Sequence, residues 1–250
     1  MFIINPAFEA LLTAAGLESL EGVMAVAGGG AMGDVPGCLT DRLEMDGSTF
    51  YLKRHRPPSP VAPSAGTQEW KTIKRLTAAG IPCPKPVAAG AGRVRDEPCS
   101  FIMTQAIAGG IPLDDFCRRR FRGPLSRTDV ELKMALIAKL TGLVRRLHRA
   151  GFCHNDLCLC HVFVHESDPI NHDFVLIDLR RVKRSGFRHR RWLVLDLAAL
   201  NYTATRGIST RSDQLRFLLH YLEIRRPNDF VRRLAASVLL ATEEIRHRDA

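Results

Sequence analysis

The sequence predicts an α+β protein of two parts: a strand-rich first part with one main helix, and a mostly helical second part with one β-hairpin. Three observations support this class. The pair Asp46-Gly47 lies between two apolar runs, as in an antiparallel hairpin. An amphipathic pattern at helical spacing covers residues 128–150, and helical periodicity continues over 192–250. The change in character near residues 104–111 predicts domains 1–104 and 105–250.

The first part begins with a predicted helix over residues 5–20. Asn5 is suited to cap it and Pro6 fits its first turn. The apolar stripe consists of Phe8, Leu11, Leu12 and Ala15. A glycine-rich stretch, VAGGGAMGD, follows this helix.

The rest of the first part reads as strands around one further helix. The hairpin signal places Phe50 to His55 on a strand, and a proline-rich loop covers residues 56–66. Helical periodicity predicts a helix over 67–80 that ends at a glycine. The segment IPCPKPVAAGAG is rich in turn residues, and residues 99–107 form an apolar strand.

The second part opens with a long helix over residues 128–150, which Gly151 stops. The segments HVFVH and DFVLID then predict a β-hairpin around the turn SDPIN. The remaining chain, 192–250, is predicted to be helical.

Composition describes an ordinary globular protein, with 46% hydrophobic and 25% charged residues among 250. No apolar run approaches the roughly 18 to 20 residues that span a bilayer, and the N-terminus does not read as a signal peptide. Seven cysteines without an export signal favour reduced thiols in a cytosolic compartment. The formal net charge of +10 implies an anionic partner such as a nucleotide, a phosphorylated glycan, nucleic acid or an anionic membrane.

The stretch GFCHNDLCLCHVFV allows two interpretations. Its cysteines and histidines suggest a zinc site, but structural zinc sites usually present paired ligands from two separated positions. The cysteines here, Cys153, Cys158 and Cys160, have the wrong spacing and no paired partner elsewhere, which favours buried structural thiols. The second interpretation is a His-x-Asp motif, His154 to Asp156, followed five residues later by His161.

The second interpretation agrees with the order of motifs along the chain. The His-x-Asp motif follows a long helix, and the predicted hairpin leads to Asp178. Upstream, Lys53 lies on a predicted strand and Glu69 on the next helix. In this order the chain resembles the protein-kinase-like superfamily, which implies a bilobal fold.

The resemblance extends to one family. GFCHNDLCLCHVFV, FVLIDLRRVKR, RRWLVLDLAALNY and RSDQLRFLLHYL are similar to the bacterial lipopolysaccharide core heptose kinases and related lipopolysaccharide kinases. In that family a histidine stands where protein kinases carry a metal-binding asparagine, as His161 does here. The resemblance covers about residues 5–225. It implies ATP-dependent phosphorylation of a sugar hydroxyl on a lipid-linked glycan, most simply the heptose of the lipopolysaccharide inner core, at the cytoplasmic face of the inner membrane.

The resemblance assigns roles to the residues of the second part. Asp156 would be the general base that accepts the proton of the acceptor hydroxyl. Asp178 and His161 would hold Mg²⁺ or Mn²⁺, although His161 could instead bond a metal-bound water or the catalytic loop. His154 would have a structural role, and Asp196 would anchor the loop from a helix.

The resemblance also assigns ATP binding to residues of the first part. Lys53 would neutralise phosphate charge and Glu69 would orient it. A glycine-rich loop would let backbone amides approach the phosphates, although a flexible loop without this role explains the glycines nearly as well. The complete set of nucleotide-binding candidates is Lys53, Glu69, Gly28, Gly29, Gly30, Gly33, Met103 and Gln105.

Two departures from protein kinases bear on the acceptor. Asn155 replaces the arginine that grips a phosphorylated activation loop, and only seventeen residues separate Asp178 from Asp196. A small or glycan acceptor therefore fits better than a protein. The segment 179–195 carries seven Lys or Arg and no acid, which indicates an anionic acceptor or a peripheral contact of residues 180–191 with an anionic membrane; a solvated loop is the alternative. The cluster CRRRFRG (117–123) could extend this face.

Other functions remain open at this point. A Ser/Thr protein kinase or a small-molecule phosphotransferase of the same superfamily would use the same residues. A basic nucleic-acid-binding protein fits the charge, but the aromatic residues, 7% of the chain, are not interleaved with the basic clusters. A pseudokinase is disfavoured because Lys53, Asp156 and Asp178 are all present.

Overall fold

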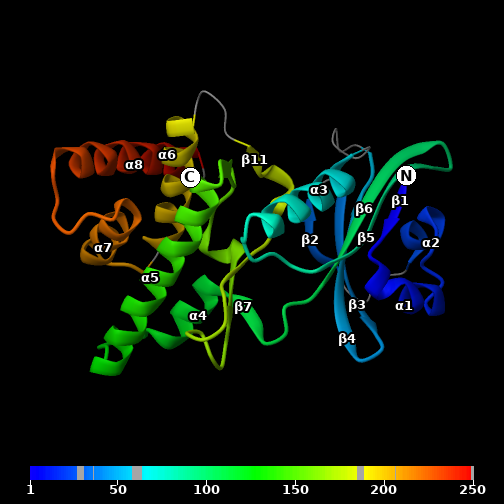
Figure 1. Cartoon of the computed structure of the whole chain (residues 1–250), viewed down its shortest axis with the longest axis horizontal. Helices are drawn as coiled ribbons and strands as arrows, with labels where there is room; N and C mark the ends of the chain where they lie inside the picture. Colours follow the sequence, from blue (N-terminus) through cyan, green and yellow to red (C-terminus); the bar gives the residue numbers. More distant parts are fainter. Residues whose placement is uncertain (27–30, 36, 58–63, 185–188, 206, 249–250) are drawn as a thin grey trace. The chain divides into compact units, whose positions relative to one another are not determined.

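The computed structural model describes residues 1–26, 31–35, 37–57, 64–184, 189–205 and 207–248 (Figure 1). The chain divides into two compact units. The first comprises Met1–Ala78 and Cys83–Ile107, and the second comprises Ala79–Pro82 and Ala108–Ala250. Strands dominate the first unit and helices the second, which confirms the predicted α+β class.

The first unit is built on one antiparallel sheet. Its strands are β1 (Phe2–Ile4), β2 (Ala31–Val35), β3 (Cys38–Met45), β4 (Ser48–His55), β5 (Pro86–Val94) and β6 (Glu97–Gln105), in the spatial order β1-β5-β6-β4-β3-β2. The predicted hairpin joins β3 to β4. Asp46 and Gly47 both have positive φ, 47° and 66°, as a two-residue hairpin turn requires.

The predicted single helix over residues 5–20 is wrong, because the segment forms the 3₁₀ turn η1 (Pro6–Phe8) and the short helix α1 (Glu9–Ala14). A second short helix, α2 (Leu20–Ala25), begins where the predicted helix ends. Gly16 has a φ of 68°, which ends α1, and the Ser19 hydroxyl then accepts a hydrogen bond from the Gly22 amide to start α2. The apolar periodicity predicts helical segments here, but the turn at Gly16 and the cap at Ser19 divide them.

The turn-rich interpretation of IPCPKPVAAGAG holds only for residues 81–85, because the rest of the segment lies in β5. Ala88 and Ala89 are fully buried, which is the result of packing rather than of local propensity. At Gly90, a Cβ atom would lie 2.5 Å from the ring of Phe101 on β6. A glycine here permits the aromatic ring to cover the strand, so this residue serves close approach and not a turn.

The two faces of the sheet carry different helices. Phe50 and Leu52 of β4 belong to the core formed with η1, α1 and α2. Lys53 alternates to the other face, where α3 (Ala65–Ala78) packs against β4, β5 and β6 (Figure 1). The helix starts two residues earlier than predicted, and it carries Glu69 on its buried side.

The second unit is mainly helical, as predicted. Its helices are α4 (Leu113–Arg120), α5 (Arg127–Arg149), α6 (His189–Ala204), α7 (Arg211–Leu222) and α8 (Asp229–Arg248). Two of them begin with a capping box: Ser126 with Asp129 on α5, and Thr210 with Asp213 on α7. Helix α5 packs against α7, and α6 packs against α8.

Short strands complete the second unit. The predicted hairpin is confirmed as β9 (Val162–His165) and β10 (Val175–Leu176), and β7 (Gly110–Pro112) adds a third strand to it. The strands β8 (Phe152–Cys153) and β11 (Lys183–Arg184) form a separate pair. The 3₁₀ turn η2 (Leu159–His161) directly precedes β9, and the 3₁₀ turn η3 (Leu179–Arg181) lies between β10 and β11 in the sequence. Within the described residues, no helix has the length and apolar character needed to cross a bilayer.

Candidate active site

The side chain of Asp196 on α6 anchors the loop that follows β8 through hydrogen bonds. The Asp196 carboxylate accepts hydrogen bonds from the backbone amides of His154 and Asn155, at 2.7 and 2.8 Å. It also lies 3.1 Å from Nε2 of His148 on α5. Asp196 is fully buried, so these contacts fix the loop rigidly at the point where the His-x-Asp motif begins.

His154 has the structural position that the sequence predicted. Its ring is completely buried, and its Nε2–H donates to the backbone carbonyl of Ile177 at 3.0 Å. Burial lowers the pKa of His154, while the nearby Asp196 carboxylate opposes this shift. The ring therefore links the loop to the end of β10 as a neutral donor, one residue before Asp178.

Three predicted residues come together at one place in the second unit. The ligand atoms of Asp156, His161 and Asp178 all lie within 4.8 Å of one another, and we call these residues the Asp–His–Asp cluster. Nδ1–H of His161 donates to the backbone carbonyl of Asp156 at 2.8 Å, so Nε2 of a neutral ring carries its lone pair free to bind a cation. Nε2 lies 3.8 Å from Oδ2 of Asp178.

The backbone at this cluster is unusual on both sides. Asn155 and Asp178 have φ angles of 61° and 52°, in the left-handed region that residues other than glycine rarely occupy. Such conformations are held in place by the surrounding structure and occur often at functional sites. Two carboxylates and an imidazole suit Mg²⁺ poorly by number of oxygens but suit Mn²⁺ well, so the residues present fit a divalent cation.

Arg181 is a neighbour of the cluster that sequence reasoning did not single out. Its guanidinium lies 3.3 Å from Oδ2 of Asp156, and both side chains are substantially exposed. Arg181 lies in the basic segment 179–195, whose composition predicts its charge but not its partner Asp156. The contact arises because η3 turns the chain back beside the His-x-Asp loop; Asn155 Nδ2 also donates to the Arg181 carbonyl at 2.9 Å.

In the first unit, the predicted lysine–glutamate pair is formed. Lys53 Nζ lies 3.3 Å from Oε1 of Glu69, with exposed fractions of 25% for the lysine and 5% for the glutamate side chain. The nearly buried carboxylate therefore holds an ammonium group that still reaches solvent. A lysine held in this way can present its charge to an anion on the α3 side of the sheet.

The remaining nucleotide-binding candidates have varied positions. Gly28, Gly29 and Gly30 lie outside the described residues, and Gly33 lies in β2. Met103 is fully buried in the core cluster of the sheet, and Gln105 ends β6 as a partly buried residue.

The basic segments differ from one another in their partners. On α4, Arg118 pairs with Asp114, Arg119 with Glu166 and Arg120 with Asp129, at 2.9, 3.2 and 2.7 Å. These three guanidiniums have carboxylate partners in ion pairs that are open to solvent, so the idea that residues 117–123 extend an anion-binding face stays a prediction. In the segment 179–195, Lys183 and Arg184 are exposed on β11, and residues 185–188 lie outside the described part.

The expectation that all cysteines are reduced thiols is wrong for one pair. Cys158 and Cys160, two residues apart, form a disulfide in the loop between Asp156 and His161. Their spacing in the sequence gives no signal for this, because residues two apart must adopt a particular turn before their sulfur atoms can meet.

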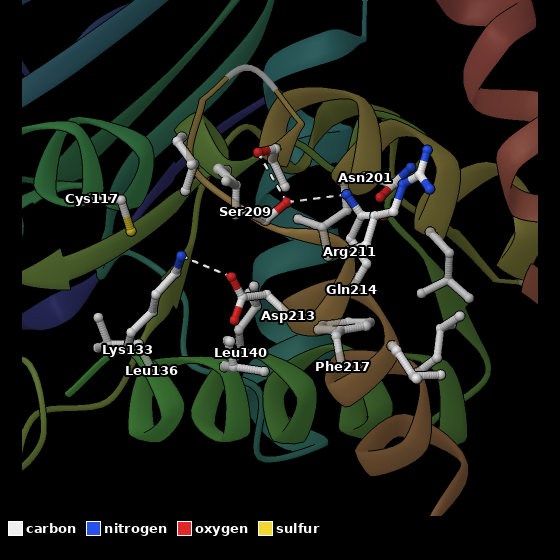
Figure 2. Close-up of a pocket in the computed structure, with 18 of the residues that line it drawn as sticks. Cys117, Lys133, Leu136, Leu140, Asn201, Ser209, Arg211, Asp213, Gln214 and Phe217 are labelled. Atoms are coloured by element: carbon white, nitrogen blue, oxygen red, sulfur yellow. Dashed lines mark hydrogen bonds and ion pairs between the residues drawn. The ribbon is translucent and has the colours of Figure 1, made fainter. Parts of the chain in front are cut away.

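An apolar pocket of about 570 Å³ lies among the helices of the second unit (Figure 2). Most of its wall is aliphatic or aromatic, with Leu136, Leu140 and Phe217 among the lining side chains. Lys133 and Asp213 form an ion pair at 2.8 Å within the wall, and both are largely buried (Figure 2). No sequence motif marked this pocket, because its lining comes from several helices that are far apart along the chain.

The fold and the two groups of residues define the class of the protein. An antiparallel sheet with a lysine–glutamate pair, a His-x-Asp loop, and an aspartate after a β-hairpin are the parts that protein-kinase-like phosphotransferases use. The chain is therefore an enzyme of the kinase class.

Similarity to known proteins identifies the family of the chain. A model of the lipopolysaccharide kinase (Kdo/WaaP) family matches residues 54–221, so the chain belongs to this family. It is 34% identical over 210 residues to the lipopolysaccharide core heptose(I) kinase WaaP of Pseudomonas aeruginosa, covering 78% of this chain and 76% of that protein. The protein of the same name from Escherichia coli is 29% identical over 197 residues, covering 73% of each.

A solved structure confirms the predicted fold over nearly the whole chain. The structure described as WaaP in complex with acyl carrier protein superposes with a TM-score of 0.75 at 30% identity. The match covers 99% of this chain and 98% of that chain. The predicted resemblance to the lipopolysaccharide core heptose kinases is thereby confirmed at the level of both sequence and fold.

Proposed function

We propose that the chain transfers the γ-phosphate of ATP to a heptose hydroxyl of the lipopolysaccharide inner core. Membership of the lipopolysaccharide kinase family supports the class of acceptor, and the WaaP relatives carry this activity in their names. The observation that carries the proposal is the Asp–His–Asp cluster, which combines a base and cation ligands on a loop anchored by Asp196.

Within this cluster, Asp156 is the general base. Its carboxylate is exposed enough to meet an acceptor hydroxyl and would accept its proton as the oxygen attacks phosphorus. Asp178 and His161 would hold a divalent cation, Mg²⁺ or Mn²⁺, which when bound neutralises the phosphate charge. Arg181, beside Asp156, would help hold an anionic acceptor.

Residues 1–104 would bind the nucleotide. Lys53 would neutralise the α- and β-phosphates, held in position by Glu69 through their 3.3 Å contact. Gly28, Gly29, Gly30 and Gly33 would approach the phosphates through their amides, and Gln105 and the backbone of Met103, whose side chain is buried in the core, would contact the rest of the nucleotide. Residues 105–250 would supply the catalytic loop and bind the acceptor.

The acceptor would be anionic and carried by a membrane lipid. The short chain between Asp178 and Asp196 has no length for a platform that docks an extended peptide, and its exposed cations Lys183 and Arg184 favour a phosphorylated glycan. We place the enzyme at the cytoplasmic face of the inner membrane, with peripheral contact through residues 180–191.

The test of this function is phosphorylation of purified core glycan. Incubating the protein with ATP, Mg²⁺ and inner-core oligosaccharide that lacks phosphate on heptose is expected to add one phosphate, measured by mass spectrometry and assigned to a hydroxyl by NMR. A protein substrate such as casein serves as the matched acceptor control. Phosphorylation of the protein but not of the glycan would contradict the proposal and favour a protein kinase.

We also propose that the chain binds an acyl carrier protein, with the fatty-acyl chain in the apolar pocket. The supporting observations are the partner named for the WaaP structure and the aliphatic lining of this pocket. Its volume of about 570 Å³ lies in the range of sites that bury an apolar ligand of moderate size.

Filling the pocket should weaken this complex. Ala235→Phe places a ring at the pocket wall, and an overpacked site costs on the order of 1–3 kcal/mol, so the affinity for palmitoyl-loaded carrier protein should fall about tenfold. Ala236→Phe is the matched control, because Ala236 is exposed on the same helix and is not part of the wall. Equal binding of carrier protein with and without its acyl chain, by calorimetry, would contradict occupation of the pocket.

A further inference from the structure

The disulfide between Cys158 and Cys160 lies inside the active-site loop. It closes a ring around Leu159, and the three residues stand directly between Asp156 and His161 of the Asp–His–Asp cluster. Any change in this bond therefore acts on the segment that connects the proposed base to a proposed cation ligand.

The bond closes the same turn that presents His161. The amide of His161 donates to the backbone carbonyl of Cys158 at 3.2 Å, within the 3₁₀ turn η2. Cys160 directly precedes His161 in the chain. The disulfide therefore joins Cys160 to Cys158, whose carbonyl accepts the hydrogen bond from the His161 amide. With the backbone fixed in this way, the His161 ring reaches the Asp156 carbonyl and lies beside Asp178.

Both sides of the disulfide-closed ring have hydrogen bonds that do not depend on the sulfur–sulfur bond, and on the C-terminal side the His161 carbonyl accepts one from the Ile177 amide at 3.0 Å. Leu157 and Leu159 are buried, with 0% and 4% exposure, and the Leu159 amide donates to the Thr203 hydroxyl of α6 at 3.1 Å. Cys158 is buried with them, whereas Cys160 is at the surface. Opening the bond would leave Cys158 in place and remove the covalent link that restrains Cys160, the residue directly before His161.

We propose that Cys158 and Cys160 form a reversible thiol–disulfide modification site whose bonded state holds His161 in the Asp–His–Asp cluster. The consequence for turnover rests on the proposed kinase function, but the site itself does not. Cys160, the cysteine of the pair at the surface, is the one that a solution thiol or disulfide would reach, and the buried Cys158 is the partner that completes the exchange.

The reaction is a thiol–disulfide exchange with a low-molecular-weight disulfide. The Cys160 thiolate attacks one sulfur of that disulfide and expels one small thiol, leaving a mixed disulfide on Cys160. The Cys158 thiolate then attacks the Cys160 sulfur, forming the protein disulfide and expelling the second small thiol. Two electrons pass from the protein thiols to the external disulfide, and a small dithiol reverses both steps.

The experiment follows the bond and cation binding in the same samples. The whole protein is equilibrated with defined mixtures of oxidised and reduced dithiothreitol, remaining thiols are alkylated, and the state of Cys158 and Cys160 is read by peptide mass spectrometry. Free Mn²⁺ is measured by electron paramagnetic resonance. Reduction is expected to weaken Mn²⁺ binding about tenfold, the lower end of the effect of losing a group that orients a metal ligand.

Cys160→Ser should bind Mn²⁺ as weakly as the reduced native protein under both conditions, and this exposed position tolerates the change. Cys38→Ser, on β3 of the first unit, is the matched control and should keep the native response. A pair that stays reduced in every mixture, or that oxidises without any change in Mn²⁺ affinity, would overturn the inference. Glycan phosphorylation is measured separately, so its failure would count against the proposed function alone.

Discussion

Replacing Asp156 with asparagine is expected to lower the turnover number by about 10²- to 10⁴-fold, the usual contribution of a positioned general base. Asparagine has nearly the same shape but cannot accept the proton of the acceptor hydroxyl. The KM for ATP should change little, because Asp156 is assigned to the acceptor and not to the nucleotide. Steady-state rates with core glycan, measured at several ATP concentrations, separate the two parameters.

The change should leave the fold intact. Asp156 and its partner Arg181 are both substantially exposed, and an ion pair at the surface contributes little to stability. Asp173→Asn is the matched control, since Asp173 is an exposed acid of the β9–β10 connection outside the cluster. A turnover number unchanged in Asp156→Asn would remove this residue from the mechanism.

Replacing Asp196 with alanine is expected to destabilise the second unit by about 2–6 kcal/mol. The change leaves the buried amide of His154 and the partly buried amide of Asn155 without their acceptor, and each such group costs about 1–3 kcal/mol. His148 loses its partner as well. Urea unfolding followed by circular dichroism measures the loss, and turnover should fall with it because the loop is no longer fixed.

Two further variants sharpen this expectation. Asp196→Asn keeps one oxygen that can accept an amide hydrogen bond, so it should lose less stability than Asp196→Ala. Asp229→Ala removes an exposed acid from the first turn of α8 and should have little effect. If Asp196→Ala and Asp229→Ala unfold at the same urea concentration, the buried carboxylate does not anchor the loop.

The support of the loop continues beyond Asp196. Nδ1 of His148 lies 2.8 Å from the hydroxyl of Tyr221 on α7, so a chain of contacts runs from α7 through α5 and α6 to the His-x-Asp loop. Burial raises the pKa of Tyr221, which keeps its hydroxyl protonated as a donor. Side chains from α7 and α5 thus support the Asp196 carboxylate of α6, which binds the two backbone amides of the loop. This support explains how so short a loop is held rigid.

Much of this molecule could be predicted from local patterns. The Asp46-Gly47 turn, the hairpin before Asp178 and the long helix α5 depend on residues close together in the sequence, and all three are confirmed. The first helix was predicted as one element because its apolar spacing continues across Gly16, whose left-handed conformation was not recognised. The alanine-rich strand β5 was missed because burial, not propensity, makes it a strand.

The sequence by itself determined the class of the enzyme. The class follows from the order of four features along the chain: Lys53, Glu69, the His-x-Asp motif and Asp178. This order, and the predicted element that carries each feature, can be read from the sequence alone. Only the tertiary structure decided which charges meet. Arg181 pairs with Asp156 of the Asp–His–Asp cluster, whereas the arginines of α4 pair with carboxylates outside it, although both segments look equally basic.

The disulfide and the apolar pocket belong to the same category. Cys158 and Cys160 meet in a turn whose residues Leu157 and Leu159 are buried, and the pocket exists because helices distant in sequence pack around it. Short-range patterns report backbone conformation and the direction of side chains. Partners across the fold depend on how whole elements pack, which no single stretch of sequence encodes.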